Sequence, residues 1–502
     1  MKKIVACLIL AALVMGLLDV LSLSPDQRDD TILSVDAAEN AALMNDEALY
    51  EELFAPGSLV EINIGISREQ LACIQRDFEK YNIIGTKGTV YRIADNVTIS
   101  VNGKTYAIGD VGLRMKGSSS RCSFYNDVLG IYNLINFRMS FTQTFDDAAE
   151  YELNTKAWPS EEARRARQER RFATLKGLEL KWNTGGDNTY VRAGYVNEVY
   201  RAYGLPVQKS NLATVSIGGI RLGVYRIYEP VNEDFIHRYF PQEDWGGDLY
   251  KVRCIGRSAA NYQANNSYGI NRKQKGTNNN FDLKTNKDTC EHQSIRHLLE
   301  VINSPGVTRE EIDAVADTDE LTRMAAVGFA LGNQDDIRSN YNNHYIYFRA
   351  SDGKAVFIPY DSEVVMGDIF SWNPPGEGMT ALSPYYVYND KYGKDQENPL
   401  MRQIVIPGGY YTDAYSGYLL ELAGSPWMEE ETFRRYYETF AAVYRDKTVP
   451  SYYYMSTMSM NTSFSMEGGA DCNGNLSVPE FLEKMKRNIL QNTVIGEAPE
   501  EN

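Results

Sequence analysis

The chain has 502 residues and a net charge of −16 at pH 7, with 43% hydrophobic and 24% charged residues. This composition is typical of a globular protein with a sizeable core. The acidic balance argues against DNA or RNA as a partner, because binding to a phosphate backbone requires a basic surface. The length would allow several domains, but the sequence shows no internal repeat that would divide it.

The first residues have the pattern of a secretory signal. Two lysines precede an apolar run over residues 4–18, which is short for a helix that spans a membrane. We therefore predict a signal peptide at residues 1–23, with an uncleaved amino-terminal membrane anchor as the alternative. Either one predicts a secreted or cell-surface associated protein. A polar, acidic spacer is expected at residues 24–55, followed by one folded domain at residues 56–495.

Strands dominate the first half of the predicted domain. Residues 60–66 alternate between apolar and polar, which indicates a half-buried strand. A hairpin is predicted over residues 97–108, because Asn102-Gly103 favours the positive φ angles of a type I′ turn. A second hairpin is predicted over residues 212–228 around two adjacent glycines.

Helices dominate the second half. Apolar residues at helical spacing predict a helix over residues 321–331 that stops at Gly332, and another helix is predicted over residues 479–491. Strands followed by helices indicate an α+β fold, with antiparallel hairpins, insertions and carboxy-terminal helices.

The residues best suited to chemistry lie between these helices, at 332–363. A polar loop leads into a hairpin, whose turn we place at Asp352-Gly353. The register of such a two-residue turn pairs His344 with Asp361. The loop before the first strand and the acidic end of the second strand are therefore expected to meet in space.

Asp335, Asn343, Asp361 and Glu363 would then form a cluster of oxygen ligands at one end of the hairpin. Such ligands suit Mg²⁺ or Mn²⁺ that bridges nucleotide phosphates. In protein kinases, likewise, one Asp accepts the hydroxyl proton, while an Asn and a second Asp bind metal.

The same stretch resembles the CotH family, in which a Gly-Asn-x-Asp loop, an Asn before a Tyr-x-Tyr strand and an Ile-Pro-aromatic-Asp-x-acid turn occur in this order. The resemblance covers the chain from about Leu59 to the last helix and implies an atypical protein kinase with a diverged kinase-like core. Four upstream segments also resemble family motifs: residues 111–121, 136–141, 223–229 and 247–251.

The resemblance implies ATP with Mg²⁺ or Mn²⁺ as cofactors and a Ser/Thr-rich surface or coat-type protein as the substrate. Asp335 would be the catalytic base, with its neighbour Asp336 as the alternative. Asn343 and Asp361 would be metal ligands. Asn340 is a further candidate, since Asp335 and Asn340 have the spacing of an ordinary kinase catalytic loop.

The cation that would hold the ATP phosphates stays open. Arg114 and Lys116 alternate along one strand and so share a face, and the turn containing Ser118 offers backbone N–H groups. Arg138 stands where the family has a lysine-rich strand, and Glu229 is the expected acidic partner of the chosen cation. The candidates for the phosphate contact are Lys116, Arg138 and Lys251.

Two alternatives remain. Residues 471–480 resemble the second half of an EF-hand loop, but the first ligand position is Gly469, so a turn into the last helix is favoured over a Ca²⁺ site. The chain could also be an inactive relative that serves as a surface-binding or structural protein. The departures at Arg138 and Glu363, where the family has a second Asp, favour that alternative, whereas the retained acids and Asn favour the enzyme.

Overall fold

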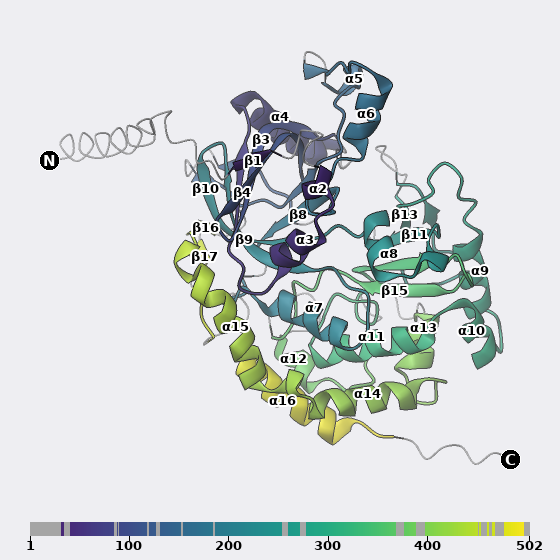
Figure 1. Ribbon diagram of the computed structural model, residues 1–502. Coiled ribbons are helices and arrows are strands. Elements are labelled where there is room, and N and C mark those ends of the chain that lie inside the picture. The colour runs from purple at the N-terminus through teal and green to yellow at the C-terminus, as the bar shows by residue number, and fades with distance from the viewer. Residues whose placement is uncertain are drawn as a thin grey trace.

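The structure of the protein is a computed structural model (Figure 1), and its fold is α+β, as the sequence predicts. The predicted signal peptide lies outside the described residues. These are residues 32–34, 41–84, 88, 90–117, 120–126, 131–151, 154–183, 186–253, 260–271, 278–367, 376–387, 397–449, 451–452, 459–460, 464–466 and 476–495.

Seven strands close into a barrel in the amino-terminal half. They are β2 (Val60–Gly65), β3 (Arg92–Val101), β4 (Lys104–Met115), β7 (Phe137–Ser140), β8 (Gly177–Trp182), β9 (Ser210–Ile217) and β10 (Ile220–Tyr228). The ring order is β4-β3-β2-β9-β10-β8-β7, and β7 pairs with β4 again. A short parallel strand, β1 (Ile32–Ser34), adds to β4 outside the ring. The inward side chains of a small barrel fill its interior, and here they form one apolar core.

Both predicted hairpins are confirmed within this barrel. Asn102 (φ 49°) and Gly103 (φ 86°) join β3 to β4, and both have the positive φ angle that a type I′ turn requires. Gly218 and Gly219 join β9 to β10 in the same way.

A second, five-stranded sheet lies beside the helices, in the order β12-β13-β11-β14-β15. Its strands are β11 (Leu249–Val252), β12 (Tyr268–Gly269), β13 (Phe281–Leu283), β14 (His344–Phe348) and β15 (Ala355–Pro359). Two short ribbons, β5 (Tyr125–Asn126) with β6 (Ile131–Tyr132) and β16 (Ser451–Tyr452) with β17 (Ser459–Met460), complete the strands of the described residues.

Helices cover the lower half of the molecule in Figure 1 and join the barrel there. At the centre, α11 (Thr318–Ala330) is rich in small apolar residues, and most of its side chains are buried against its neighbours. The other helices of this half are α7 (Arg192–Ala202), α8 (Glu233–Tyr239), α9 (Gln293–Ile302), α10 (Arg309–Val315), α12 (Gly376–Ala381), α13 (Pro399–Ile404), α14 (Thr412–Gly424), α15 (Glu430–Tyr444) and α16 (Val478–Asn492).

The remaining helices accompany the barrel: α2 (Ala41–Met44), α3 (Glu47–Phe54), α4 (Arg68–Ile84), α5 (Ala148–Tyr151) and α6 (Glu161–Gln168). The α3 helix corrects the predicted boundary of the spacer. Leu49, Tyr50, Leu53 and Phe54 are buried along one stripe of this helix, so the folded part begins before residue 56. The acidic residues between them hid this stripe in the sequence.

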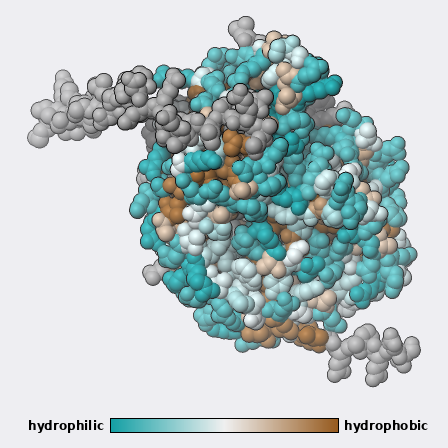
Figure 2. Space-filling view, viewed as in Figure 1, coloured by the Kyte–Doolittle hydropathy of each residue, from teal (hydrophilic) through white to brown (hydrophobic). Residues whose placement is uncertain are grey.

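Most of the face shown in Figure 2 is hydrophilic, in keeping with the acidic composition. Large apolar side chains that are exposed among the described residues include Leu490, Val494 and Ile495 near the end of the chain. Within the described ranges, none of the helices has both the length and the apolar composition needed to cross a lipid bilayer.

Candidate active site

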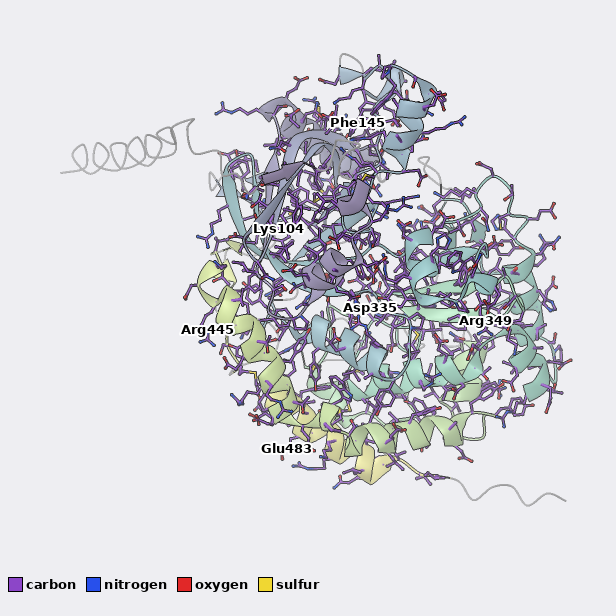
Figure 3. The ribbon with its side chains drawn as sticks, viewed as in Figure 1. Lys104, Phe145, Asp335, Arg349, Arg445 and Glu483 are labelled. Atoms are coloured by element: carbon purple, nitrogen blue, oxygen red, sulfur yellow. The ribbon has the colours of Figure 1, made fainter. Side chains whose placement is uncertain are left out.

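The loop between α11 and β14 gathers amide side chains around Asp335, which lies between the barrel and the helices (Figure 3). Asn340 Nδ2 donates a hydrogen bond to Asp335 Oδ1 (2.9 Å), and Asn343 Nδ2 donates to Asp335 Oδ2 (2.7 Å). Asn342 makes a longer contact of 3.4 Å to each oxygen. Two amides therefore fix the orientation of this half-buried carboxylate, with a third close by.

Asp336 has a different environment from its neighbour. It is 3% exposed, and its Oδ1 accepts hydrogen bonds from the backbone amides of Arg338 (2.9 Å) and Ser339 (2.8 Å). A side chain at Gly328 of α11 would collide with Asp336 Oδ2, so the carboxylate packs directly on that helix. Burial raises the pKa of Asp336. This placement suits a residue that anchors the loop, and it favours Asp335 as the one that meets a substrate.

Replacing Asp336 with Ala is expected to lower the free energy of unfolding by about 2–4 kcal/mol, because two buried amides and the nearby Arg338 guanidinium would lose their acceptor. Denaturant-induced unfolding measures this effect. Asp335→Ala is the matched control and should cost less than about 1 kcal/mol, since Asp335 and its partners Asn342 and Asn343 are partly exposed and those two amides can turn toward water. Equal losses for the two variants would contradict the anchoring role of Asp336.

The hairpin after the loop is confirmed, but the predicted register is wrong by two residues. His344 pairs with Pro359, where the sequence placed Asp361. The reason is the turn: residues 350–353 form a four-residue loop, in place of the two-residue turn expected at Asp352-Gly353. Arg349 N donates to Lys354 O (3.1 Å), and Gly353 N donates to Arg349 O (2.9 Å).

The loop and the end of β15 still meet, as predicted. Tyr360 N donates to Asn343 O at 3.1 Å. Asn343 (φ 51°) and Asp361 (φ 63°) both adopt the left-handed conformation, which Asn and Asp tolerate better than most residues. Such backbone positions concentrate at functional sites.

Lys181 of β8 crosses from the barrel to the residues that follow β15. Its ammonium group forms a close ion pair with Asp361 Oδ1 and a second ion pair with Glu363 Oε1 at 3.0 Å. The Lys181 side chain is only 5% exposed. Burial alone would lower the pKa of Lys181, but the two carboxylates raise it well above its usual value, so the lysine is charged.

The two carboxylates respond differently to this lysine. Burial acts to raise the pKa of Asp361, yet Lys181 and then Lys116 hold it below its usual value. Burial raises the pKa of Glu363 despite the opposing charge of Lys181, and the charge of Asp361 raises it further. Asp361 is therefore the firmly ionised member of the pair.

A second ion-pair group lies on the same strand. Glu179 Oε2 accepts hydrogen bonds from Lys116 Nζ (2.6 Å) and from the hydroxyl of Tyr360 (3.1 Å), and Arg138 Nη1 lies 3.9 Å from Glu179 Oε1. Despite burial, Lys116, Arg138 and Lys251 hold the pKa of Glu179 far below its usual value. Lys116 and Arg138 thus lie together, with Glu179 as their common acid.

Glu229 is not the acid that orients these cations, and that prediction is wrong. Its buried carboxylate accepts hydrogen bonds from the hydroxyls of Tyr50 (2.9 Å) and Tyr239 (2.7 Å) and pairs with Arg238 (2.9 Å). It therefore ties α3 to α8 at the end of β10. Sequence order alone could not decide between two strand acids, Glu179 and Glu229.

The remaining predicted cations are placed as follows. Lys251 Nζ lies 3.8 Å from the centre of the Tyr360 ring, and no carboxylate of the described chain forms an ion pair with it. Burial, followed by the charge of Lys116, lowers the pKa of Lys251 well below its usual value. Arg114 stacks instead on Tyr91 at 4.8 Å, outside this group. Ser118 lies outside the described residues.

Lys181 and Glu179 are the site residues that the sequence reasoning missed, although β8 carries a usable signal. Every residue of Gly177–Trp182 is buried, and the two charges alternate with Leu178 and Leu180. Charged residues are seldom fully buried without a partner. A Glu and a Lys on one face of an otherwise apolar strand therefore predict an ion-pair site at that face.

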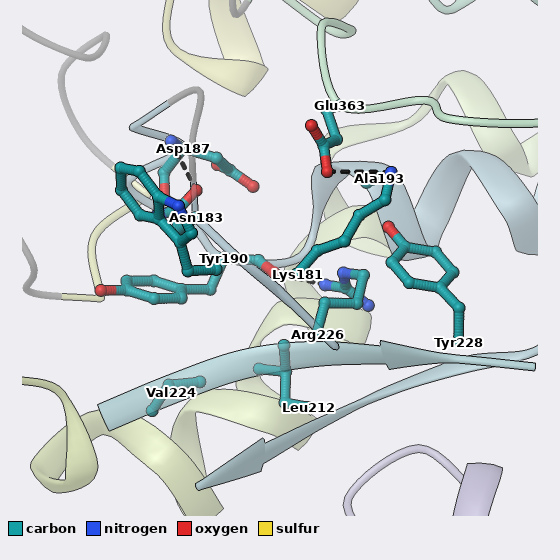
Figure 4. Close-up of a pocket in the computed structure, with 11 residues that line it drawn as sticks. Lys181, Asn183, Asp187, Tyr190, Ala193, Leu212, Val224, Arg226, Tyr228 and Glu363 are labelled. Carbon is teal, nitrogen blue, oxygen red and sulfur yellow. Dashed lines mark hydrogen bonds and ion pairs between the residues drawn. The ribbon is translucent and has the colours of Figure 1, made fainter. Parts of the chain in front are cut away.

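A small pocket adjoins this ion pair on the side of α7 (Figure 4). Lys181 and Glu363 stand at one end of it, and the rings of Tyr190 and Tyr228 form parts of its wall. Arg226 lines it as well, and donates to the backbone oxygen of Tyr190. The pocket gives water a place beside the buried Lys181 and the partly exposed Glu363.

The oxygen atoms around the loop fit a divalent cation that is shared with phosphates. Asn340 Oδ1 is buried and, among the described residues, lacks a hydrogen-bond partner, as expected of a ligand awaiting an ion. The described ranges hold no set of three His, Cys, Asp or Glu side chains that could bind a metal by itself. Mg²⁺ commonly takes one or two protein ligands and completes its shell with phosphates and water. Asn340 Oδ1 and the Asp361 carboxylate are oxygen ligands of that kind.

The calcium alternative gains little support. Residues 471–475 lie outside the described residues. Glu480, the proposed bidentate ligand, instead accepts hydrogen bonds from the backbone and hydroxyl of Ser477 in a capping box at the start of α16. Its carboxylate is thus already used at the helix terminus.

A family model and a solved structure are similar to this chain. The family model described as "CotH kinase protein" matches residues 135–463. A crystal structure of a Helicobacter pylori proinflammatory kinase, CtkA, is similar over 54% of this chain and 87% of that chain, with 12% identity and a TM-score of 0.24. The search of curated proteins found no match to this chain.

Proposed function

The chain belongs to the CotH kinase protein family, and from this premise we propose that it transfers the γ-phosphate of ATP to Ser or Thr hydroxyls of another protein. One observation carries the proposal. The loop that orients Asp335 is hydrogen-bonded to the strand end that bears Asp361, and Asp361 is paired with a buried lysine. A base, a metal ligand and a phosphate-binding cation thus lie in one place.

Asp335 accepts the proton of the acceptor hydroxyl in this proposal. Asn343 and Asn340 hold its carboxylate by hydrogen bonds of 2.7 and 2.9 Å. These bonds restrict the orientation of the carboxylate, as a positioned base requires. The neighbouring Asp336 stabilises the loop by accepting hydrogen bonds from the backbone amides of Arg338 and Ser339.

Lys181, Lys116 and Lys251 supply positive charge for the phosphates. All three lie in or beside the Glu179–Tyr360–Asp361 group, and their burial strengthens their attraction to an anion. Mg²⁺ or Mn²⁺ bound by Asn340 and Asp361, with Glu363 next to them, would neutralise the charge of the phosphates.

The order of these groups along the chain supports a diverged kinase-like core as part of the proposal. A strand lysine, Lys181, is followed by Asp335 with Asn340 five residues later, and then by Asp361 after a hairpin. Protein kinases have the same order. In them a helix glutamate pairs with the lysine, whereas Lys181 here pairs with Glu363.

The proposal includes the setting of the reaction. We expect the acceptor to be a Ser/Thr-rich surface or coat-type protein, and the enzyme to be secreted or held at the cell surface by its amino-terminal segment. The basis is the apolar run at residues 4–18.

Incubation of the purified protein with ATP labelled at the γ-phosphate, Mn²⁺ or Mg²⁺ and a Ser-rich acceptor tests the proposal. We expect label on Ser or Thr that disappears with EDTA and falls at least about a hundredfold in Asp361→Asn. Transfer unaffected by both changes would contradict the assigned metal site. ATP binding without any transfer would instead favour the inactive, surface-binding relative.

A further inference from the structure

Residues 251–287 are strongly basic, although the whole chain carries a net charge of −16. This segment has eight Lys or Arg residues and a single acid, Asp282. The cations are Lys251, Arg253, Arg257, Arg272, Lys273, Lys275, Lys284 and Lys287. A local excess of positive charge in an acidic protein indicates a negatively charged partner.

The fold attaches this segment to the catalytic loop. Its first strand, β11, pairs antiparallel with β14, so that Val252 lies opposite His344, the residue after Asn343. The hydroxyl of Tyr262, farther along the segment, is hydrogen-bonded to Nε2 of the same histidine. The end of β11 that leads to Arg253 therefore lies beside the loop that orients Asp335.

Three cations of the described part of the segment share one face of the sheet. Lys251 pairs with Asp282 across β11 and β13, and residues two apart on a strand point to the same side, which places Arg253 and Lys284 there too. Lys284 forms an ion pair with Asp282. Arg253 donates to Asn278 Oδ1 at 2.8 Å, and its Nε is buried without a partner.

Asp282 is shared among these cations: it pairs with Lys284, whereas Arg253 has the amide oxygen of Asn278 as its partner. Burial lowers the pKa of Lys251, Arg253 and Lys284, and the opposing charge of Asp282 does not offset this for Arg253 or Lys284. An anion placed among them would offset this effect of burial. Lys251 contacts Tyr360, so ATP phosphates can neutralise its charge. Arg253 and Lys284 are not among the cations that we assign to the phosphates.

We propose that Arg253 and Lys284 bind acidic side chains that flank the acceptor hydroxyl, so that the substrate is an acidic Ser/Thr segment of a protein. The inference rests on the proposed function and names its substrate class. A short acidic peptide fits this site, because it can contact two or three cations without extending onto the acidic surface around them. A long polyanion would run onto the acidic remainder of the surface, where it would be repelled.

Peptide binding tests the inference without catalysis. The probe is a fluorescent peptide with the sequence of residues 24–40 of this chain, which carries Ser24, Thr31 and Ser34 among five acidic residues. Its anisotropy is measured with the full Asp335→Asn protein. We expect saturable binding that weakens with added NaCl and falls about tenfold when the five acids are replaced by their amides.

Charge variants locate the binding. Arg253→Gln with Lys284→Gln should raise the dissociation constant of the acidic probe about five- to tenfold. Arg253→Glu with Lys284→Glu should reverse the preference, toward a probe in which lysines replace the acids. Lys354→Gln, just before the edge strand β15 and separated from β13 by β11 and β14, is the control and should leave binding unchanged.

The outcomes separate the two proposals. Acidic-probe binding that follows these variants supports the inference even if no phosphate transfer is found. Equal binding of the acidic and amidated probes, or no response to either Arg253–Lys284 pair in a folded protein, overturns it and leaves the proposed kinase activity standing. Binding of RNA or of anionic lipid vesicles in place of the peptide would also overturn it.

Discussion

Replacing Asp335 with Asn is expected to slow phosphate transfer by about 10²–10⁴-fold, because the amide cannot accept the proton of the acceptor hydroxyl. ATP binding should change less than about threefold, since Asp361 and the phosphate-binding lysines lie on other segments and Asn340 itself is retained. Single-turnover transfer of label measures the first effect, and titration with a fluorescent ATP analogue measures the second. A thermal melt checks that the variant remains folded.

Asn342→Ala is the matched control for this substitution. Asn342 belongs to the same loop, but its contacts with Asp335 are 3.4 Å, against 2.9 and 2.7 Å for Asn340 and Asn343. Its loss should slow transfer less than about fivefold. If Asp335→Asn kept a tenth or more of the rate, Asp335 would not be the base.

Local sequence predicted the parts of the site that short-range geometry determines. Asp335, Asn340 and Asn343 lie within nine residues of one another, so their spacing sufficed to bring them together. The hairpin beyond them was predicted as well. Its register was not, because the loop at residues 350–353 closes with four residues and only the backbone conformation distinguishes that turn from a two-residue one.

Long-range pairing determined what the sequence could not predict. Glu179 meets Arg138 and Lys116, which is 63 residues away in the sequence, because β8 pairs with β7 and β7 pairs with β4 to close the barrel. Closure of the barrel depends on all seven strands, so no local sequence pattern predicts it. Glu229 is also a glutamate and follows β10, the neighbour of β8, but its partners come from α3 and α8.

Replacing Lys181 with Met should slow phosphate transfer by about 10²–10³-fold, because a buried cation that would stabilise the phosphates is lost. It should also lower the free energy of unfolding by about 1–3 kcal/mol at pH 7, since Asp361 and Glu363 would keep their charges without a counterion. Lys181→Arg keeps the charge and should recover most of the stability. Rate measurements and denaturant unfolding check the two effects.

The pH dependence of that loss separates an ion pair from mere packing. In the native chain the pKa of Asp361 is below its unfolded value, so its contribution to stability is present above about pH 4 and is lost as the pH falls. Without Lys181, burial and the charge of Glu363 would raise the pKa of Asp361, and stability would then fall as the pH rises. The difference in unfolding free energy between the native chain and Lys181→Met should therefore grow from pH 4 to pH 7. A difference that is equal at both pH values would mean that Lys181 stabilises the fold through its methylene groups, and would remove it as the counterion of Asp361.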